Sequence, residues 1–193
     1  IRAMLRRALA VAVLLAPLPA LAQAPAPTVR AHRVSEPMRI DGKLDEAVYS
    51  GTPAITGFVQ QEPDEFKPAT ERTEAWIFFD DQNVYVSAKL YESEPGRRVQ
   101  SEMRRDSFNM YNNDHLAIEF DTFYDRRNGF GMSSNSEGGM FDWVVTNEQS
   151  NPNWNQVWNV RTAEFDGGWS AEFVVPFRSL RFREGGTVWG INM

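Results

Sequence analysis

The sequence of 193 residues contains no cysteine, which excludes a disulfide framework and thiol chemistry. Histidine is scarce too, and its two residues, His32 and His115, are too far apart in sequence to form a zinc motif. No serine lies in a Gly-x-Ser-x-Gly elbow, and no motif singles out an acid and base pair among the 26 acidic residues. The sequence therefore predicts a non-catalytic domain, with a glycoside hydrolase domain elsewhere in the full-length protein left open.

Long apolar runs are confined to the N-terminus. Arg6 and Arg7 precede the apolar stretch Ala8–Leu18, and Ala20-Leu21-Ala22 fits the small-residue rule for signal cleavage. The stretch is shorter than the roughly 20 residues that cross a bilayer as a helix. We therefore predict a signal peptide over 1–22 and an exported protein, located in the periplasm, the outer membrane or at the cell surface.

The remaining sequence is predicted to form one domain. Met4 is the expected start, and residues 1–3 are expected to be upstream read-through. Residues 23–33 are predicted to be a Pro/Ala-rich linker and a first strand, and 34–193 has the length of one ordinary domain. The sequence ends on Thr187–Met193, which has strand composition and no turn after it. We therefore expect the domain to be truncated and to contact the C-terminal remainder of the same chain.

An excess of positive charge is also absent. Without the signal peptide, the chain has 17 Lys+Arg and 26 Asp+Glu, a net charge of −9. This balance argues against nucleic acid or anionic lipid as a partner. No other segment is long and apolar enough for a transmembrane helix.

Strand patterns dominate the rest of the sequence. Ala75–Phe79 and Val84–Tyr91 flank the turn residues Asp80–Asn83, which predicts a hairpin. Many short strands with turns about every ten residues predict an all-β fold, an antiparallel β-sandwich of the jelly-roll or immunoglobulin-like type. One or two short helical turns are expected, around Leu44–Tyr49 and near Ser179.

Aromatic residues are abundant, with six Trp and five Tyr. Flat aromatic rings can stack on the C–H faces of sugars, but they also fill cores. Tryptophans inside regular strands are predicted to be core residues: Trp76, Trp169 and Trp189. Tyr111, Trp154 and Trp158 lie beside Asn-rich loops, and for these three both ligand contact and packing stay open.

Polar residues near Tyr111 are candidates for hydrogen bonds to a ligand. Arg105, Asp106 and Asn113 fit this role, because an Arg fork can bind hydroxyl or carboxylate groups. The alternative is that such residues tie loops to the sandwich through ion pairs.

An oxygen-rich run indicates a possible calcium site. Asp121, Asp125 and Asn128 offer the carboxylate and amide oxygens that Ca²⁺ prefers, although their spacing matches no EF-hand. The alternative is turn capping together with ion pairs to Arg126 and Arg127.

Four segments together resemble the family 9 carbohydrate-binding module. Ile40-Asp41-Gly42 with Asp45-Glu46 matches its opening, and the later matches are Ala69–Ser93, Asp114–Phe123 and Gly168–Phe182. The nearest resemblance is to the version at the N-terminus of large bacterial outer-membrane β-barrel proteins. The resemblance implies a β-sandwich, a polysaccharide or oligosaccharide partner, and the structural calcium that modules of this family often hold.

Only some of the residues that bind sugar in the family have counterparts in this sequence. Sugar-binding members have a Trp where this chain has Tyr111, a Glu where it has Ala117, and an Arg in the region Phe130-Gly131-Met132. Their second stacking Trp would lie beyond Met193. Two hypotheses follow: a carbohydrate-binding module that stacks a glycan on Tyr111 and on Trp154 or Trp158, or a structural or protein-contacting periplasmic domain of an outer-membrane β-barrel protein that has lost sugar binding.

Overall fold

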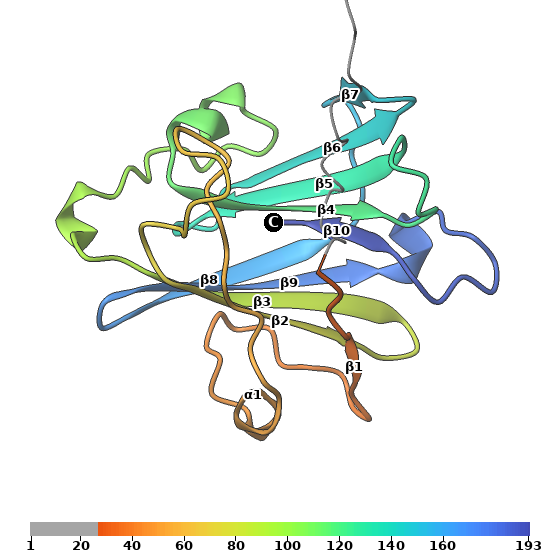
Figure 1. Cartoon of the computed structure of the whole chain (residues 1–193), viewed down its shortest axis with the longest axis horizontal. Coiled ribbons are helices and arrows are strands. Elements are labelled where there is room, and N and C mark those ends of the chain that lie inside the picture. The colour runs from red at the N-terminus through yellow and green to blue at the C-terminus, as the bar shows by residue number, and fades with distance from the viewer. Residues whose placement is uncertain (1–26) are drawn as a thin grey trace, which may run out of the picture.

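The computed structural model describes residues 27–193, so the predicted signal peptide and the first linker residues lie outside the described residues. The chain forms two five-stranded sheets that lie one above the other in Figure 1. Short helical turns connect some of the strands. This confirms the prediction of an all-β sandwich. Within 27–193 no helix is long and apolar enough to cross a membrane.

The first sheet has the strand order β1-β2-β3-β9-β8. Its β1–β2 pair is parallel, and the other pairs are antiparallel. The strands are β1 (His32–Arg33), β2 (Thr73–Phe79), β3 (Asn83–Tyr91), β8 (Asn159–Phe165) and β9 (Gly168–Pro176).

The second sheet has the order β10-β4-β5-β6-β7 and is antiparallel throughout. Its strands are β4 (His115–Asp121), β5 (Gly129–Asn135), β6 (Met140–Thr146), β7 (Gln149–Asn151) and β10 (Gly190–Asn192). The helical turns are α1 (Ala47–Gly51), η1 (Pro95–Arg97), η2 (Phe108–Asn112) and η3 (Phe177–Ser179).

The predicted hairpin is confirmed as β2–β3, which pair from Thr73 with Leu90 to Phe79 with Val84. Alternate residues of both sheets point inward and form one core between the layers. Its members include Val86, Ala88, Leu116, Ile118, Phe120, Phe130, Met132, Trp169, Ala171, Phe173 and Val175. Burial of each large apolar side chain stabilises the fold by roughly 1.5–3 kcal/mol, which is how a chain without disulfides holds together.

A second, smaller core lies on the outer side of the first sheet. Trp76 and Phe78 point away from the main core and are covered by the segment that carries Leu44 and Tyr49. Strand β2 is therefore covered on both faces. Trp76 and Trp169 are buried, as predicted.

The Asp41-Gly42 turn fastens this segment to the sheet. The backbone N–H groups of Asp41 and Gly42 donate to the buried carboxylate of Glu172, at 3.0 and 2.8 Å. Gly42 has φ of 87°, and a Cβ there would lie 2.5 Å from the backbone carbon of Thr162. The hydroxyl of Tyr49 also donates to Glu172, at 2.7 Å. Burial raises the pKa of Glu172, and these donors partly offset that effect.

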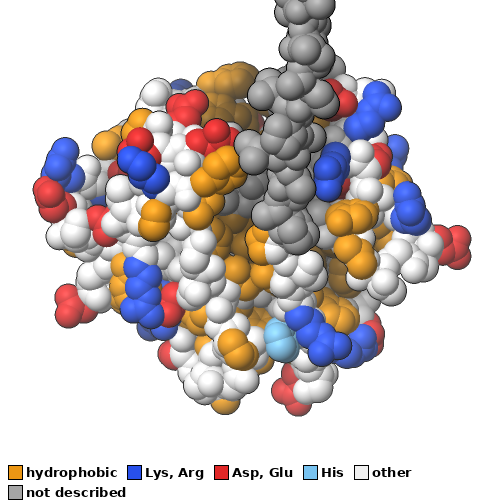
Figure 2. All heavy atoms as spheres, viewed as in Figure 1, with side chains coloured by type: hydrophobic (Ala, Val, Ile, Leu, Met, Phe, Trp, Pro, Cys, Tyr) orange, Lys and Arg blue, Asp and Glu red, His pale blue; other side chains and the backbone are white. Residues whose placement is uncertain are grey.

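Charged side chains do not segregate by sign on the face that Figure 2 shows. Lys and Arg side chains alternate there with Asp and Glu side chains, and hydrophobic side chains lie between them.

Candidate functional site

An aromatic surface covers the outer face of the second sheet. Strand β6 alternates, so that Met140 and Val144 pack against the main core while Phe141 and Trp143 point to the other side. Phe141 is nevertheless only 1% exposed, because other aromatic residues cover it. We call Phe108, Tyr111, Phe141 and Trp143 the outer aromatic surface.

Two of its rings come from η2. The ring centroid of Tyr111 lies 5.3 Å from that of Phe141, and the centroid of Phe108 lies 5.7 Å from it. Both η2 rings remain open to solvent, with Tyr111 59% and Phe108 65% exposed. The structure therefore places Tyr111 on the surface, where its ring packs on Phe141, an aromatic contact that sequence reasoning missed.

Buried hydrogen bonds hold the loop that carries η2. The Asn113 side-chain oxygen accepts from the Glu102 backbone N–H and from Asn135 Nδ2, both at 3.0 Å, and its Nδ2 donates to the Asn109 carbonyl at 3.0 Å. Asn113 is 6% exposed. The structure favours the alternative in which Asn113 ties a loop to the sandwich, because its polar atoms are already paired inside the protein, and its contact with a ligand stays a prediction. It acts to position Tyr111.

Glu102 is the second anchor of this loop. Its carboxylate accepts from the backbone N–H and the guanidinium of Arg104 and from the Ser107 hydroxyl, the last at 2.6 Å. These donors lower the pKa of Glu102 to about 2, the Arg104 guanidinium most of all. Ser107 also caps η2 by accepting from the Asn109 N–H. Tyr111 is therefore presented by an ordered turn.

Trp158 lies inside the sandwich and not at the surface. It is 5% exposed, and its ring stacks on Phe173 at 5.8 Å with 9° between the planes. Its Nε1–H donates to the buried Asp142 carboxylate at 2.8 Å. The structure therefore favours packing over ligand contact for Trp158, because its ring stacks on Phe173, the Arg105 guanidinium lies 5.7 Å from the ring centroid and its N–H is bonded to Asp142.

Arg105 and Asp106 lie at the rim of the same buried network. The Arg105 Nη2 group donates to Asp142 at 2.5 Å and to the Gln156 carbonyl at 3.1 Å, and Arg105 Nε lies 3.4 Å from Asp106. Burial raises the pKa of Asp142, and the bonds from Trp158 and Arg105 oppose that rise. The structure therefore favours the alternative in which these charges tie a loop to the sandwich.

Trp154 is separated from Tyr111 by the sheet. Its ring lies 5.3 Å from the ring of Phe130, whose side chain belongs to the main core between the layers. Tyr111 packs on the outer side of that sheet. The structure does not bring Trp154 and Tyr111 together, and the half-buried Trp154 closes an edge of the core.

The oxygen-rich loop after β4 is a capped turn. The Asp121 carboxylate accepts from the backbone N–H groups of Asp125 and Arg126, at 3.1 and 2.7 Å. Asp125 accepts from Arg127 and Asn128 N–H groups and from Asn128 Nδ2, which lowers the pKa of Asp125, the side-chain bond from Asn128 contributing most. Among the described residues no three acidic or histidine side chains gather as metal ligands. These bonds favour the alternative of turn capping, and the calcium site stays a prediction.

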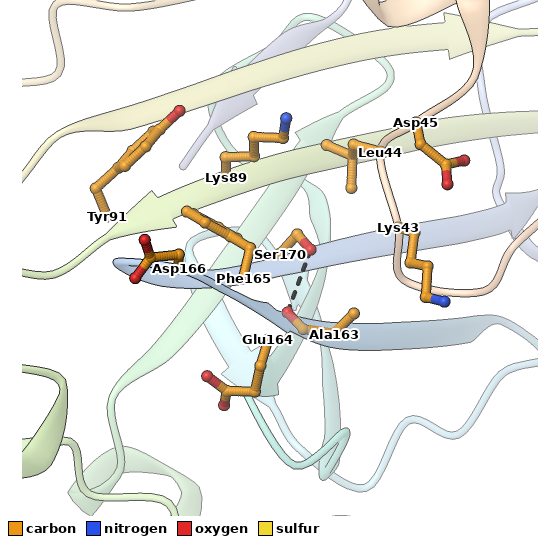
Figure 3. A pocket seen from close by; sticks show the side chains of 10 residues that line it. All are labelled: Lys43, Leu44, Asp45, Lys89, Tyr91, Ala163, Glu164, Phe165, Asp166 and Ser170. Atoms are coloured by element: carbon orange, nitrogen blue, oxygen red, sulfur yellow. Dashed lines mark hydrogen bonds between the residues drawn. The ribbon is translucent and has the colours of Figure 1, made fainter.

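A shallow hollow lies on the opposite face of the molecule, over β3, β8 and β9 (Figure 3). Its lining residues are Lys43, Leu44, Asp45, Lys89, Tyr91, Ala163, Glu164, Phe165, Asp166 and Ser170. Glu164 pairs with Arg98, and the Arg72 guanidinium lies 4.7 Å over the Tyr91 ring. Arg72 therefore covers the Tyr91 ring, and the ring centroid of Phe165 lies 5.2 Å from that of Tyr91 in an edge contact.

Comparisons with known proteins agree with this architecture. Residues 40–193 match the family described as carbohydrate family 9 binding domain-like. A family 9 module from Caldicellulosiruptor kristjanssonii in complex with glucose has a TM-score of 0.55 and 15% identity, over 84% of this chain and 75% of that one. The module in complex with cellotriose gives a TM-score of 0.52 and 16% identity, over 83% of this chain and 72% of that one. At such identities the likeness shows the fold. No curated protein matches the chain.

The family match covers most of the sequence, including the Asp-Gly turn, the β2–β3 hairpin and β4. The family consists of binding domains, which confirms the prediction of a non-catalytic domain. The chain belongs to the carbohydrate family 9 binding domain-like family.

Proposed function

We propose that this domain binds a polysaccharide or oligosaccharide on its outer aromatic surface, with Tyr111 as the ring on which a sugar stacks. The observation that carries this is the setting of Tyr111. It is 59% exposed, and it meets Phe141 and His115 in edge contacts with interplanar angles of 69° and 85°. Such contacts orient a ring and leave apolar area for a ligand.

The comparisons support carbohydrate binding as the class of function. The chain belongs to a family of carbohydrate-binding domains, and the solved modules with this fold include complexes with glucose and with cellotriose. The proposal further holds that the protein is exported, which rests on the signal-peptide pattern over 1–22.

A structural or protein-contacting role is the second candidate. Ala117 lies on the outer side of β4, where the resemblance to sugar-binding members leads one to expect Glu, and the region Phe130-Gly131-Met132 of β5 contains no Arg, which the resemblance also leads one to expect. Phe108 and Met103, on the loop before β4, are 65% and 67% exposed. A protein partner that covered this loop would bury both side chains and would also explain their exposure.

Calorimetric titration with neutral oligosaccharides separates the two roles. We expect saturable heat from the protein and a roughly 5- to 30-fold weaker Kd in Tyr111→Ala, because loss of one stacking ring costs about 1–2 kcal/mol. Tyr124→Ala is the matched control, since Tyr124 is a loop tyrosine that is 58% exposed. Absence of heat from a folded protein across cello-, manno-, xylo- and malto-oligosaccharides would favour the protein-contacting role.

A further inference from the structure

Trp143 lies flat against the outer side of the second sheet. It pairs in register with Gly131 of the neighbouring strand β5. A Cβ at position 131 would lie 1.9 Å from Cε2 and 2.2 Å from Cζ2 of the indole. The ring therefore occupies the space that any side chain at 131 would need, and its inner face rests on the sheet.

Glu119 fixes the ring in that orientation. Glu119 pairs with Gly131 from the other side, on β4, so that the order across the sheet is Glu119, Gly131, Trp143. The indole Nε1–H donates to Glu119 Oε2 at 2.9 Å. Because the ring is pinned by both the glycine and the carboxylate, a ligand that stacks on it would not have to order it first.

The outer face of Trp143 remains available. Trp143 is only partly buried, and its centroid lies 6.0 Å from that of Phe141 with 39° between the planes. Phe141 also contacts Tyr111. Trp143 and Tyr111 are therefore the half-exposed neighbours of one buried ring, so they flank it on the same face of the sheet.

The charge around Trp143 has one sign. The outward positions of the central strands are His115, Ala117, Glu119 and Asp121 on β4, Gly129, Gly131, Ser133 and Asn135 on β5, and Phe141, Trp143 and Val145 on β6. None of these is Lys or Arg. Glu119 makes no ion pair among the described residues, and Oε2 is bonded by the indole. A hydroxyl group can donate to this carboxylate, whereas a second carboxylate would be repelled.

We propose that Trp143 and Glu119 form a second sugar subsite beside Tyr111, which takes a neutral pyranose by stacking on the indole and by donation of a sugar hydroxyl to Glu119. This inference rests on the proposed function and adds a second ring and a charge preference to it. The surface then binds neighbouring units of one glycan and discriminates against uronic acids.

Titration of matched sugars tests the subsite. The probes are cellotriose, mannotriose, xylotriose and maltotriose, each compared with its own monosaccharide. We expect Trp143→Ala to weaken trisaccharide binding roughly tenfold, with a smaller effect on the monosaccharide, because one of two stacking rings is lost. Trp154→Ala is the matched control, since that half-buried Trp packs on Phe130 on the inner side of the sheet.

Glu119→Gln tests the charge preference and keeps the fold, because a Gln side chain is nearly isosteric and its oxygen still accepts from the indole. The probes are methyl glucoside and methyl glucuronide, which differ in the carboxylate. The protein is expected to bind the glucoside more tightly, and the variant is expected to lose most of this difference.

Two outcomes would overturn the subsite, and they differ. If no neutral sugar binds the folded protein, the proposed function fails and the subsite fails with it. If sugars bind and Tyr111→Ala weakens them while Trp143→Ala and Trp143→Phe bind trisaccharides like the parent protein, the function stands and the subsite alone is wrong.

Discussion

Substitution of Gly131 by Ala tests the packing on which the outer aromatic surface depends. The new methyl group would overlap the Trp143 ring, with distances of 1.9 to 2.4 Å to three indole atoms, so the indole must move off the sheet. It then loses its hydrogen bond to Glu119, and a bond to a charged acceptor contributes about 1.5–3 kcal/mol. The substitution also reduces the conformational freedom of the unfolded chain, which raises the free energy of unfolding by about 0.4–1 kcal/mol. We expect a net loss of about 1.5 kcal/mol in the free energy of unfolding.

Urea unfolding followed by far-UV circular dichroism measures this loss, and Gly96→Ala is the control because a Cβ there meets nothing within 4 Å. The double variant with Trp143→Ala completes a thermodynamic cycle. Without the indole, the added methyl group is expected to cost less than about 0.5 kcal/mol, since it then fills open space. An equal cost of Gly131→Ala in both backgrounds, or no cost in the parent protein, would refute the placement of Trp143 on Gly131.

Three further results are expected. Burial raises the pKa of Glu172 above its ordinary 4.5, so the contribution of its protonation to stability is complete below pH 4.5 and is lost as the pH rises through the folded-state pKa. Glu172→Gln is therefore expected to flatten the dependence of stability on pH above pH 4.5. An unchanged slope of Tm against pH in thermal melts of the variant would contradict this. Trp158→Phe removes a hydrogen-bond donor from the buried Asp142, so it is expected to lower the free energy of unfolding in urea by about 1.5–3 kcal/mol. Its affinity for sugars is expected to be unchanged, and weaker sugar binding would show that Trp158 contributes to the binding site. Addition of EDTA is expected to leave the Tm unchanged, because backbone N–H groups already satisfy Asp121 and Asp125, and a clear fall in Tm that calcium reverses would show a cation site.

Local patterns allowed much of the fold to be predicted. The hairpin β2–β3 follows from two alternating segments around Asp80–Asn83, and the Asp41-Gly42 turn follows from glycine chemistry. What the sequence could not show is the buried acceptor of that turn, because Glu172 lies about 130 positions away along the chain. Its pairing depends on the tertiary fold.

The site was harder to predict, because it is assembled by strand register. Phe141 and Trp143 point outward, while Asp142 between them points into the sandwich. This reverses the usual alternation, in which apolar side chains point inward and polar side chains point outward. For Trp158, next to an Asn-rich loop, the sequence left packing and ligand contact open, and in the structure its N–H donates to the buried Asp142. The available sequence signal for an apolar outer face was the alternation of Phe141, Trp143 and Val145 along one predicted strand.

The central claim is that this family member binds sugar on the outer aromatic surface. Calorimetric titration of the parent protein, Tyr111→Ala and Tyr124→Ala with the same neutral oligosaccharides tests it most directly. The account predicts saturable heat that weakens by roughly 5- to 30-fold in Tyr111→Ala and is unchanged in Tyr124→Ala. Equal affinity in all three proteins, or no heat from any of them while they remain folded, would contradict it.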